Sequence, residues 1–254
     1  MKHELCKYSE LESFDAYLAS LSSPIDSFLE EHILESQFYR IVVEGREIGF
    51  FATHHGSLLT QFHLVAGESR YGQEVLADIL GQNQLRMAFV PTCDEFFLSH
   101  ALDKYVNLKK QALFFIDSKQ PIKLKGNSLK AAYRPAEQSD VSTIQAISGN
   151  FVDDLVRRVS RHEIHVGHLN GEIIAIGLII KSQLWANQAS IGMFTHEAYR
   201  RQGIGAQTVL YLKHVCHNCD MRPLAGCRYN NTKSQMTLQA AGMVTMTRLL
   251  RFTF

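Results

Sequence analysis

The chain has 254 residues, of which 46% are apolar and 20% are charged, with 16 glycines and 5 prolines. This length suits one large domain or two of ordinary size, and the composition excludes disordered and collagen-like classes. The 26 Lys and Arg residues against 25 Asp and Glu residues give a net charge of +1, so we expect no extended binding to nucleic acid.

The sequence also bears on where the protein resides. Its longest apolar stretch, residues 173–180, is too short to cross a bilayer, so no membrane association is expected. The first residues, MKHELCKYSELES, carry acidic side chains where a signal peptide needs an apolar segment. Five cysteines, an odd number, suit reduced thiols better than a disulfide framework. We therefore expect a cytoplasmic protein.

The first half contains a strand, a turn and a strand over residues 39–51, with Gly45 in the turn. Residues 59–65 predict a third strand, and a short connection over residues 66–70 leads into a helix that begins near Tyr71. The aromatic pairs at 96–97 and 114–115 are typical of core strands and helix faces.

A loop-rich stretch follows at residues 115–127, where Ser, Pro, Gly, Asn and Lys collect. Such punctuation indicates a linker. We place the domain boundary there, giving domains at residues 1–124 and 125–254.

The second half has a clearer pattern. We expect strands at residues 129–134, 162–169, 172–181, 189–195, 224–229 and 244–254, and helices at 141–147, 152–159, 200–214 and 232–241. In the strand over 162–169, Ile164 and Val166 alternate with His165. Asn170 and Gly171 form the two-residue turn that hairpins favour. The order predicts a mixed α/β fold, and the first half is a fainter copy of it.

The strongest chemical signal is Arg200-x-x-Gly203-x-Gly205, between a strand and a helix. Glycines here permit a tight turn and close approach of a ligand to the main chain, and the helix adds unpaired N–H groups. Together they predict a cradle for a pyrophosphate. A dinucleotide fingerprint fits poorly because Thr208 stands where a third small residue is needed, and a P-loop would end in Gly-Lys-Ser/Thr.

The third phosphate-binding candidate fits best. The second half resembles the GNAT superfamily of acetyl-CoA-dependent N-acetyltransferases through Arg200, Gly203 and Gly205, and downstream through Asn231, Ser234, Leu238, Gly242 and Met243. The resemblance implies two GNAT-like α/β units, each a mixed, mostly antiparallel sheet flanked by helices. The first unit would be a degenerate copy, because its connection over residues 66–70 lacks the paired glycines.

The resemblance also implies roles for individual residues. Main-chain groups at residues 193–195 would hold the pantetheine arm as an added strand, and the amides of residues 202–207 would hold the pyrophosphate. The expected acetyl-CoA-binding residues are Met193, Phe194, Thr195, Arg200, Arg201, Gln202, Gly203, Ile204, Gly205, Ala206, Gln207, Asn231 and Ser234. The implied reaction is attack of a primary amine of a small molecule or protein on the acetyl thioester.

Two departures leave the general acid and base unassigned. Many relatives carry a Tyr at the position of Leu238, and many carry a Glu on the strand that here reads Ala-Ser-Ile at 189–191. Tyr229, Glu163 and His165 are the substitute candidates. The alternative function is a catalytically silent protein that binds or senses acyl-CoA. The sequence does not identify the acceptor, and a homodimer is one arrangement open to the chain.

We expect no metal site. Cys216-x-x-Cys219 lies near histidines, but it lacks the second pair that a closed zinc site needs. The 12 histidines, His54 and His55 among them, are scattered through both halves without ligand spacing.

Overall fold

The computed structural model describes residues 1–83, 85–122 and 130–254. They form two compact units: unit 1 comprises Met1–Leu113 with Thr247–Phe254, and unit 2 comprises Phe114–Met246. The expected boundary between residues 124 and 125 lies outside the described residues. The C-terminal segment, expected in the second domain, is part of unit 1. Among the described helices, none combines the length and apolar character needed to cross a bilayer.

Unit 1 is a sheet flanked by helices. Its strands are β1 (Lys2–Cys6), β2 (Gln37–Val43), β3 (Arg46–His54), β4 (Leu58–Leu64) and β5 (Met87–Pro91), and β5 pairs with the end of β12 (Met243–Thr253). Its helices are α1 (Phe14–Ser20), α2 (Ser27–Leu34), α3 (Gly72–Gln82) and α4 (Glu95–Leu102), with 3-10 turns η1 (Tyr8–Glu10) and η2 (Ala66–Tyr71).

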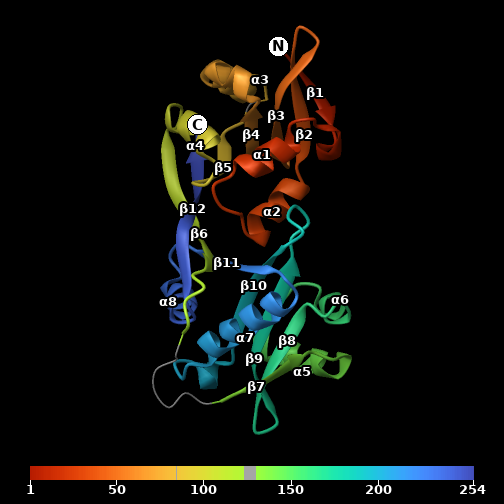
Figure 1. Ribbon diagram of the computed structural model, residues 1–254, viewed down its shortest axis with the longest axis vertical. Coiled ribbons are helices and arrows are strands. Elements are labelled where there is room, and N and C mark those ends of the chain that lie inside the picture. Colours follow the sequence, from red (N-terminus) through yellow and green to blue (C-terminus); the bar gives the residue numbers. More distant parts are fainter. Residues whose placement is uncertain (84, 123–129) are drawn as a thin grey trace. The chain divides into compact units, whose positions relative to one another are not determined.

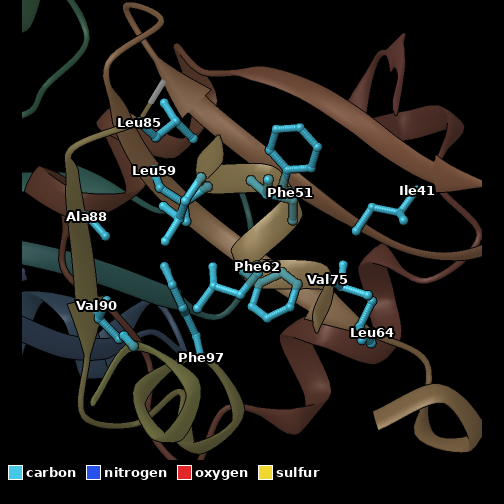
Figure 2. Packing of buried hydrophobic residues seen from close by; sticks show 14 of the residues in the cluster. Ile41, Phe51, Leu59, Phe62, Leu64, Val75, Leu85, Ala88, Val90 and Phe97 are labelled. Carbon is cyan, nitrogen blue, oxygen red and sulfur yellow. The ribbon is translucent and has the colours of Figure 1, made fainter. Parts of the chain in front are cut away.

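The core of unit 1 is built from aliphatic and aromatic side chains of the central strands and of α3 and α4. Figure 2 shows Phe51, Leu59, Phe62, Val90 and Phe97 converging, and each is fully buried. Burial of a large apolar side chain contributes about 1.5–3 kcal/mol, so this cluster is a principal source of the unit's stability.

Unit 2 contains the strands β7 (Ala132–Pro135), β8 (Ile164–Leu169), β9 (Glu172–Lys181), β10 (Gln188–Thr195) and β11 (Arg222–Arg228), in the order β11-β10-β9-β8-β7. Strand β6 (Asn107–Asp117) reaches unit 2 at its end. The helices are α5 (Val141–Ser148), α6 (Leu155–Ser160), α7 (Ile204–Asn218) and α8 (Thr232–Ala240), with η3 (Gln138–Asp140) and η4 (Glu197–Tyr199). All pairs within β7–β10 are antiparallel, whereas β10 and β11 are parallel.

Most of the expected elements of unit 2 are present. Strand β9 has the expected bounds, and Asn170 and Gly171 have the positive φ values of 52° and 84° that their tight turn requires. Helix α7 begins at Ile204 rather than at the expected Arg200, because Arg201 and Gly203 have positive φ values. It continues past His214 to Asn218 because its apolar face extends to the buried Cys216. Of the strand expected at residues 129–134, Leu129 lies outside the described residues.

The alternation expected in β8 is present. Ile164 and Val166 face α5 and α6, as part of one apolar cluster. His165, expected on the opposite side, lies there but is only 5% exposed. The reason is that α7 packs along the other face of the sheet (Figure 1), and its Tyr211 meets the His165 ring. Both faces of β8 are therefore covered.

Candidate functional site

The site begins where two parallel strands of unit 2 part. The register of β10 with β11 runs from Gln188↔Arg222 to Ser190↔Leu224. Strand β10 continues to Thr195, and on its other side it stays paired with β9 throughout. Figure 1 shows β11 and β10 as neighbours, with α7 running across the sheet. The second half of β10 thus has one edge directed toward the opening between the two strands.

The orientation of the main chain along this edge follows from the ladder. The N–H of His196 donates to the carbonyl of Ile174 at 2.9 Å, and antiparallel pairs alternate, so even-numbered residues of β10 direct their main-chain groups to β9. Met193 and Thr195 therefore direct theirs toward β11. The Thr195 carbonyl accepts a hydrogen bond from Arg200 Nε at 3.1 Å. This edge can accept an extended ligand as an additional strand.

The connection from β10 to α7 places an anion-binding geometry beside that edge. Arg201 and Gly203 have φ values of 62° and 82°, a left-handed conformation that glycine adopts without strain. Gly203 caps α7 without a side-chain hydrogen bond, and no acidic residue lies in the first turn. The amides at the start of α7 therefore keep their donors, and the positive end of the helix dipole lies there.

Gly205 has a packing role within this connection. A Cβ on Gly205 would lie 3.0 Å from Cγ2 of Thr237 in α8 and 3.4 Å from Oγ1 of Thr195. The start of α7 therefore approaches both the end of β10 and α8 closely. Sequence reasoning identified the glycine but not Thr237, since no local pattern indicates which residue of a later helix packs against it.

Cationic side chains lie beside the connection. Arg200 and Arg201 are both exposed, and the guanidinium carbon of Arg200 lies 5.8 Å from the centre of the Phe194 ring. Gln202 donates from Nε2 to the carbonyl of Ala198 at 3.1 Å. The two arginines supply positive charge near the start of α7, which suits an anionic ligand.

Asn231 and Ser234 lie at the start of α8. Oδ1 of Asn231 accepts a hydrogen bond from the N–H of Ser234 at 3.1 Å, so Asn231 is the N-cap of this helix. Its amide Nδ2 remains directed away from the cap bond. Leu238, farther along α8, is 3% exposed and belongs to the core.

The three candidates for acid–base chemistry lie in different surroundings. Glu163 accepts from Arg158 Nη1 at 2.9 Å. His165 Nδ1 is hydrogen-bonded to the hydroxyl of Tyr211 at 3.1 Å, and burial lowers its pKa to about 4. Tyr229 directly follows β11, which borders the opening, and is half-buried. The structure therefore places only Tyr229 of the three next to the parted strands.

A buried ion pair joins α7 to the end of β6. Lys213 Nζ lies 2.8 Å from Oδ1 of Asp117 and donates to the carbonyl of Ala241 at 2.9 Å. Both charged side chains are less than a tenth exposed. Removing one partner of such a pair leaves an uncompensated buried charge, at a cost of about 3–5 kcal/mol. Sequence reasoning missed this contact, because its partners are far apart in the chain.

Cys216 near the end of α7 has the surroundings of a structural thiol, whereas Cys219 is exposed. Cys216 is fully buried, and burial raises its pKa to about 12. His217, expected nearby, instead lies with Nε2 3.1 Å from Oδ2 of Asp117. A thiol with such a raised pKa is a poor source of the thiolate that binds metal.

Comparison with protein families matches both halves of the chain. A model described as "Acetyltransferase (GNAT) domain" matches residues 8–118, and one described as "Acetyltransferase (GNAT) family" matches residues 129–243. The chain belongs to the GNAT superfamily. It carries two GNAT domains in tandem, as the sequence resemblance predicted, and the α/β fold expected for them is confirmed. Membership identifies an acyltransferase family.

Solved structures share the GNAT fold over the whole chain. A GNAT-family acetyltransferase from Colwellia psychrerythraea is 20% identical, with full coverage of both chains and a TM-score of 0.88. A GCN5-related N-acetyltransferase from Sphaerobacter thermophilus is 12% identical, covers 99% of this chain and 95% of its own, and has a TM-score of 0.66. A tandem GNAT protein from the clavulanic acid biosynthesis pathway is 10% identical, covers 100% and 98%, and has a TM-score of 0.61. Comparison with curated protein sequences gives no significant match.

Proposed function

We propose that this protein is an acetyl-CoA-dependent N-acetyltransferase whose second GNAT domain binds the acetyl donor. One observation carries the proposal. The open edge of β10, which begins where its pairing with β11 ends at Ser190, leads directly into an α7 N-terminus without a side-chain cap. An edge strand and an anion cradle placed end to end match a ligand with an amide-rich arm and a diphosphate.

The residues of this site would bind the donor at three places. Met193 and Thr195 would hold the pantetheine arm through main-chain groups, and the amides of residues 202–206 would hold the diphosphate. The N–H of Gln207, also expected there, instead donates to the Gly203 carbonyl at 3.1 Å. Arg200 and Arg201 would add positive charge, and Asn231 would use Nδ2 while its Oδ1 caps α8. Gly205 supports this arrangement, because it lies close to Thr195 and Thr237. A side chain at position 205 would intrude there, whereas glycine leaves the main chain accessible to the ligand.

The reaction is acyl transfer from sulfur to nitrogen. The neutral amine attacks the thioester carbonyl carbon, the C–N bond forms and the C–S bond breaks. The nitrogen loses one proton, and the leaving thiolate takes one. Besides positioning the reactants, the protein must place an acid within reach of the sulfur. Tyr229 is the candidate we favour, because it directly follows β11 beside the opening between the strands. Glu163 is paired with Arg158, and His165 is bonded to Tyr211. The acceptor is a primary amine of a small molecule or protein.

A cytoplasmic location fits the same proposal. The five cysteines, all within the described residues, form no disulfide, and a reducing compartment keeps thiols in this state.

The alternative is a silent acyl-CoA-binding or sensing protein. Leu238 stands where many relatives carry a catalytic Tyr, and it is buried in the core. The stretch Ala189–Ile191 offers no carboxylate. Binding of the donor without turnover on any amine would favour this function.

The test combines binding with turnover. Calorimetry with acetyl-CoA should show one site per chain, and release of free thiol should follow addition of a suitable amine from a panel. Gly205→Val should weaken binding by ~100-fold or more, because its side chain would intrude between the start of α7 and Thr237. The matched control is Gly67→Val in η2 of unit 1, where a Cβ meets nothing within 4 Å. The proposal is wrong if the unchanged protein does not bind acetyl-CoA. It is also wrong if Gly205→Val binds acetyl-CoA as the unchanged protein does while both variants melt normally.

A further inference from the structure

A group of metal-ligating side chains lies in unit 1, apart from the site described above. Glu35, His54 and His55 each offer one ligand atom, and these three atoms lie within 4.8 Å of one another. Glu35 is the C-cap of α2, while His54 ends β3 and His55 begins the turn to β4. The residues come from two elements that pack together, so the fold itself brings them to one place.

The backbone of the turn explains how two consecutive histidines can face the same point. Along a regular strand, neighbouring side chains point to opposite faces. Here His55 has a φ of 48° and Gly56 a φ of 65°, so the chain reverses immediately after His54. The pairing of β3 with β4 also shifts register between Ala52 and Thr53, and such a bulge re-aims the side chains that follow it. As a result, the His54 and His55 ring centres are 4.0 Å apart.

The end of α2 favours a cation at this place. Helix C-termini carry a partial negative charge from their unpaired carbonyl groups, and Glu35 adds a full one. His32, in the last turn of α2, has Nδ1 2.8 Å from the carbonyl of Phe28. A donor bond from Nδ1 leaves Nε2 as the lone-pair nitrogen, which is the usual arrangement of a metal-binding imidazole. The ring of His32 lies 4.7 Å from that of His54.

One nitrogen of His54 is left without a hydrogen bond. Its Nδ1 is buried and has no hydrogen-bond partner among the described residues. A buried polar atom without a partner is unfavourable, and a bound ion would remove that cost.

We propose that Glu35, His54 and His55 form a binding site for a divalent transition-metal ion of the Zn²⁺ class. Two imidazoles and one carboxylate suit this class, whereas Mg²⁺ and Ca²⁺ prefer all-oxygen sites. The remaining coordination positions are open to water or to His32. The sequence did not reveal this group of side chains, because Glu35 is separated from the two histidines by strand β2 and most of strand β3.

The test uses the full chain without an added histidine tag. Titration with Zn²⁺ should saturate at one equivalent and raise the melting temperature, and Mg²⁺ at the same concentration should do neither. His55→Asn and Glu35→Gln should each weaken Zn²⁺ binding by about tenfold or more, since even indirect changes at metal sites cost about 10–100-fold. Both residues are exposed, so the variants should fold.

The matched control is His162→Asn. Like His55, His162 is exposed and has a positive φ, here 57°, but it lies in unit 2. The control should bind Zn²⁺ as the unchanged protein does. The proposal is overturned if Zn²⁺ fails to bind at millimolar concentration, if all three variants weaken binding equally, or if Co²⁺ substitution produces the charge-transfer absorption of a thiolate ligand, which would place the ion at a cysteine.

Discussion

The two GNAT units differ most in one connection. It follows β4 in unit 1 and β10 in unit 2, the strands that begin the parallel pairs β4–β5 and β10–β11. In unit 1, β4 pairs with β5 in parallel from Leu58↔Met87 to Leu59↔Ala88, and η2 then leads straight into α3. In unit 2, β10 leads through Arg201 and Gly203, both with positive φ, into α7. Gly72 at the start of α3 has an ordinary helical φ of −53°. The folds agree while the backbone conformations of the two connections do not.

The electrostatic surroundings of the two helix starts also differ. Glu74 lies in the first turn of α3, and Glu68 in η2 is paired with Arg46. The first turn of α7 carries no acidic residue. A carboxylate at a helix N-terminus already occupies the favourable field that an anionic ligand would use. The first turn of α3 in unit 1 therefore has a negative charge of its own, whereas the first turn of α7 in unit 2 has none.

Packing completes the contrast. A Cβ on Gly72 would lie 2.0 Å from Nε2 of His100, whose Nδ1 bonds the Phe96 carbonyl at 2.7 Å. The start of α3 is thus covered by an imidazole from α4. At Gly205, near the start of α7, the atoms closest to such a Cβ belong to the small side chains of Thr195 and Thr237. A shared fold therefore does not imply a shared site, because the site depends on a few dihedral angles, charges and small side chains.

The largest difference that we expect between the two units concerns the residue that follows the second strand of each parallel pair. Tyr229 follows β11, whereas Thr92 follows β5 and is hydrogen-bonded to Arg248 through Oγ1 at 2.9 Å. If Tyr229 protonates the leaving thiolate, Tyr229→Phe should lower kcat by about 100-fold, with KM for acetyl-CoA nearly unchanged. Steady-state thiol release measures both constants. An unchanged kcat would remove this functional difference between the units.

A smaller effect should follow from giving α7 the charge found in α3. Gln207→Glu adds a carboxylate at the end of the first turn of α7 while keeping the acceptor that the N–H of Ala131 uses at 3.4 Å. We expect acetyl-CoA binding to weaken by about tenfold at low salt, and less at high salt because ions screen the repulsion. Gln207→Lys, of similar length, should shift affinity the other way. Equal affinities for both variants would show that charge at this turn does not distinguish the units.

Much of unit 2 could be predicted because its signals are local. The bounds of β9 and the Asn170-Gly171 turn each depend on residues close together in sequence. The helix expected from residue 200 begins at Ile204. The Arg200 to Gly205 segment belongs to the same class, since a left-handed residue before a helix has a compact signature. The roles of these residues in binding stay a prediction.

The remainder depended on contacts between distant segments. His165 was expected on the face opposite Ile164 and Val166, but that Tyr211 of α7 covers this face could not be predicted. Thr247–Phe254 joins unit 1 because residues 249–253 pair with β5, and strand periodicity does not identify a partner. Likewise, the convergence of Glu35 with His54 requires knowing how α2 packs on β3. Periodicity gives the elements, and only tertiary packing gives their neighbours.

Each unit has a buried histidine that should make it sensitive to acid. Burial lowers the pKa of His63 and of His165 to about 4, below the unfolded value near 6.5. The folded state then binds fewer protons, so stability is fully present above pH 6.5 and is lost as the pH falls toward 4, by about 1–3 kcal/mol for each histidine. Asp26 and Asp94 act in the opposite direction, because burial raises the pKa of each to about 7. The loss is therefore measured by comparing the unchanged protein with histidine variants in denaturation at pH 7 and 4.5. His165→Gln and His63→Gln should each reduce it, and NMR titration should place both imidazoles well below pH 6. A normal pKa for either would contradict its burial.

The smallest effect separates two roles of a helix cap that the units share. Asp94 accepts from the N–H of Phe97 at 3.0 Å to cap α4, as Asn231 accepts from Ser234 to cap α8. Asn231→Asp makes the second cap like the first, so α8 should keep its stability, whereas Asn231→Ala should lose about 1 kcal/mol. Because aspartate lacks the Nδ2 donor, acetyl-CoA should bind Asn231→Asp about 3–10-fold more weakly, the value of one hydrogen bond. Calorimetry and thermal melting measure the two properties separately. If both variants bind acetyl-CoA as the unchanged protein does, Asn231 acts only on the helix, and unit 2 then differs from unit 1 in its α7 connection rather than in its cap.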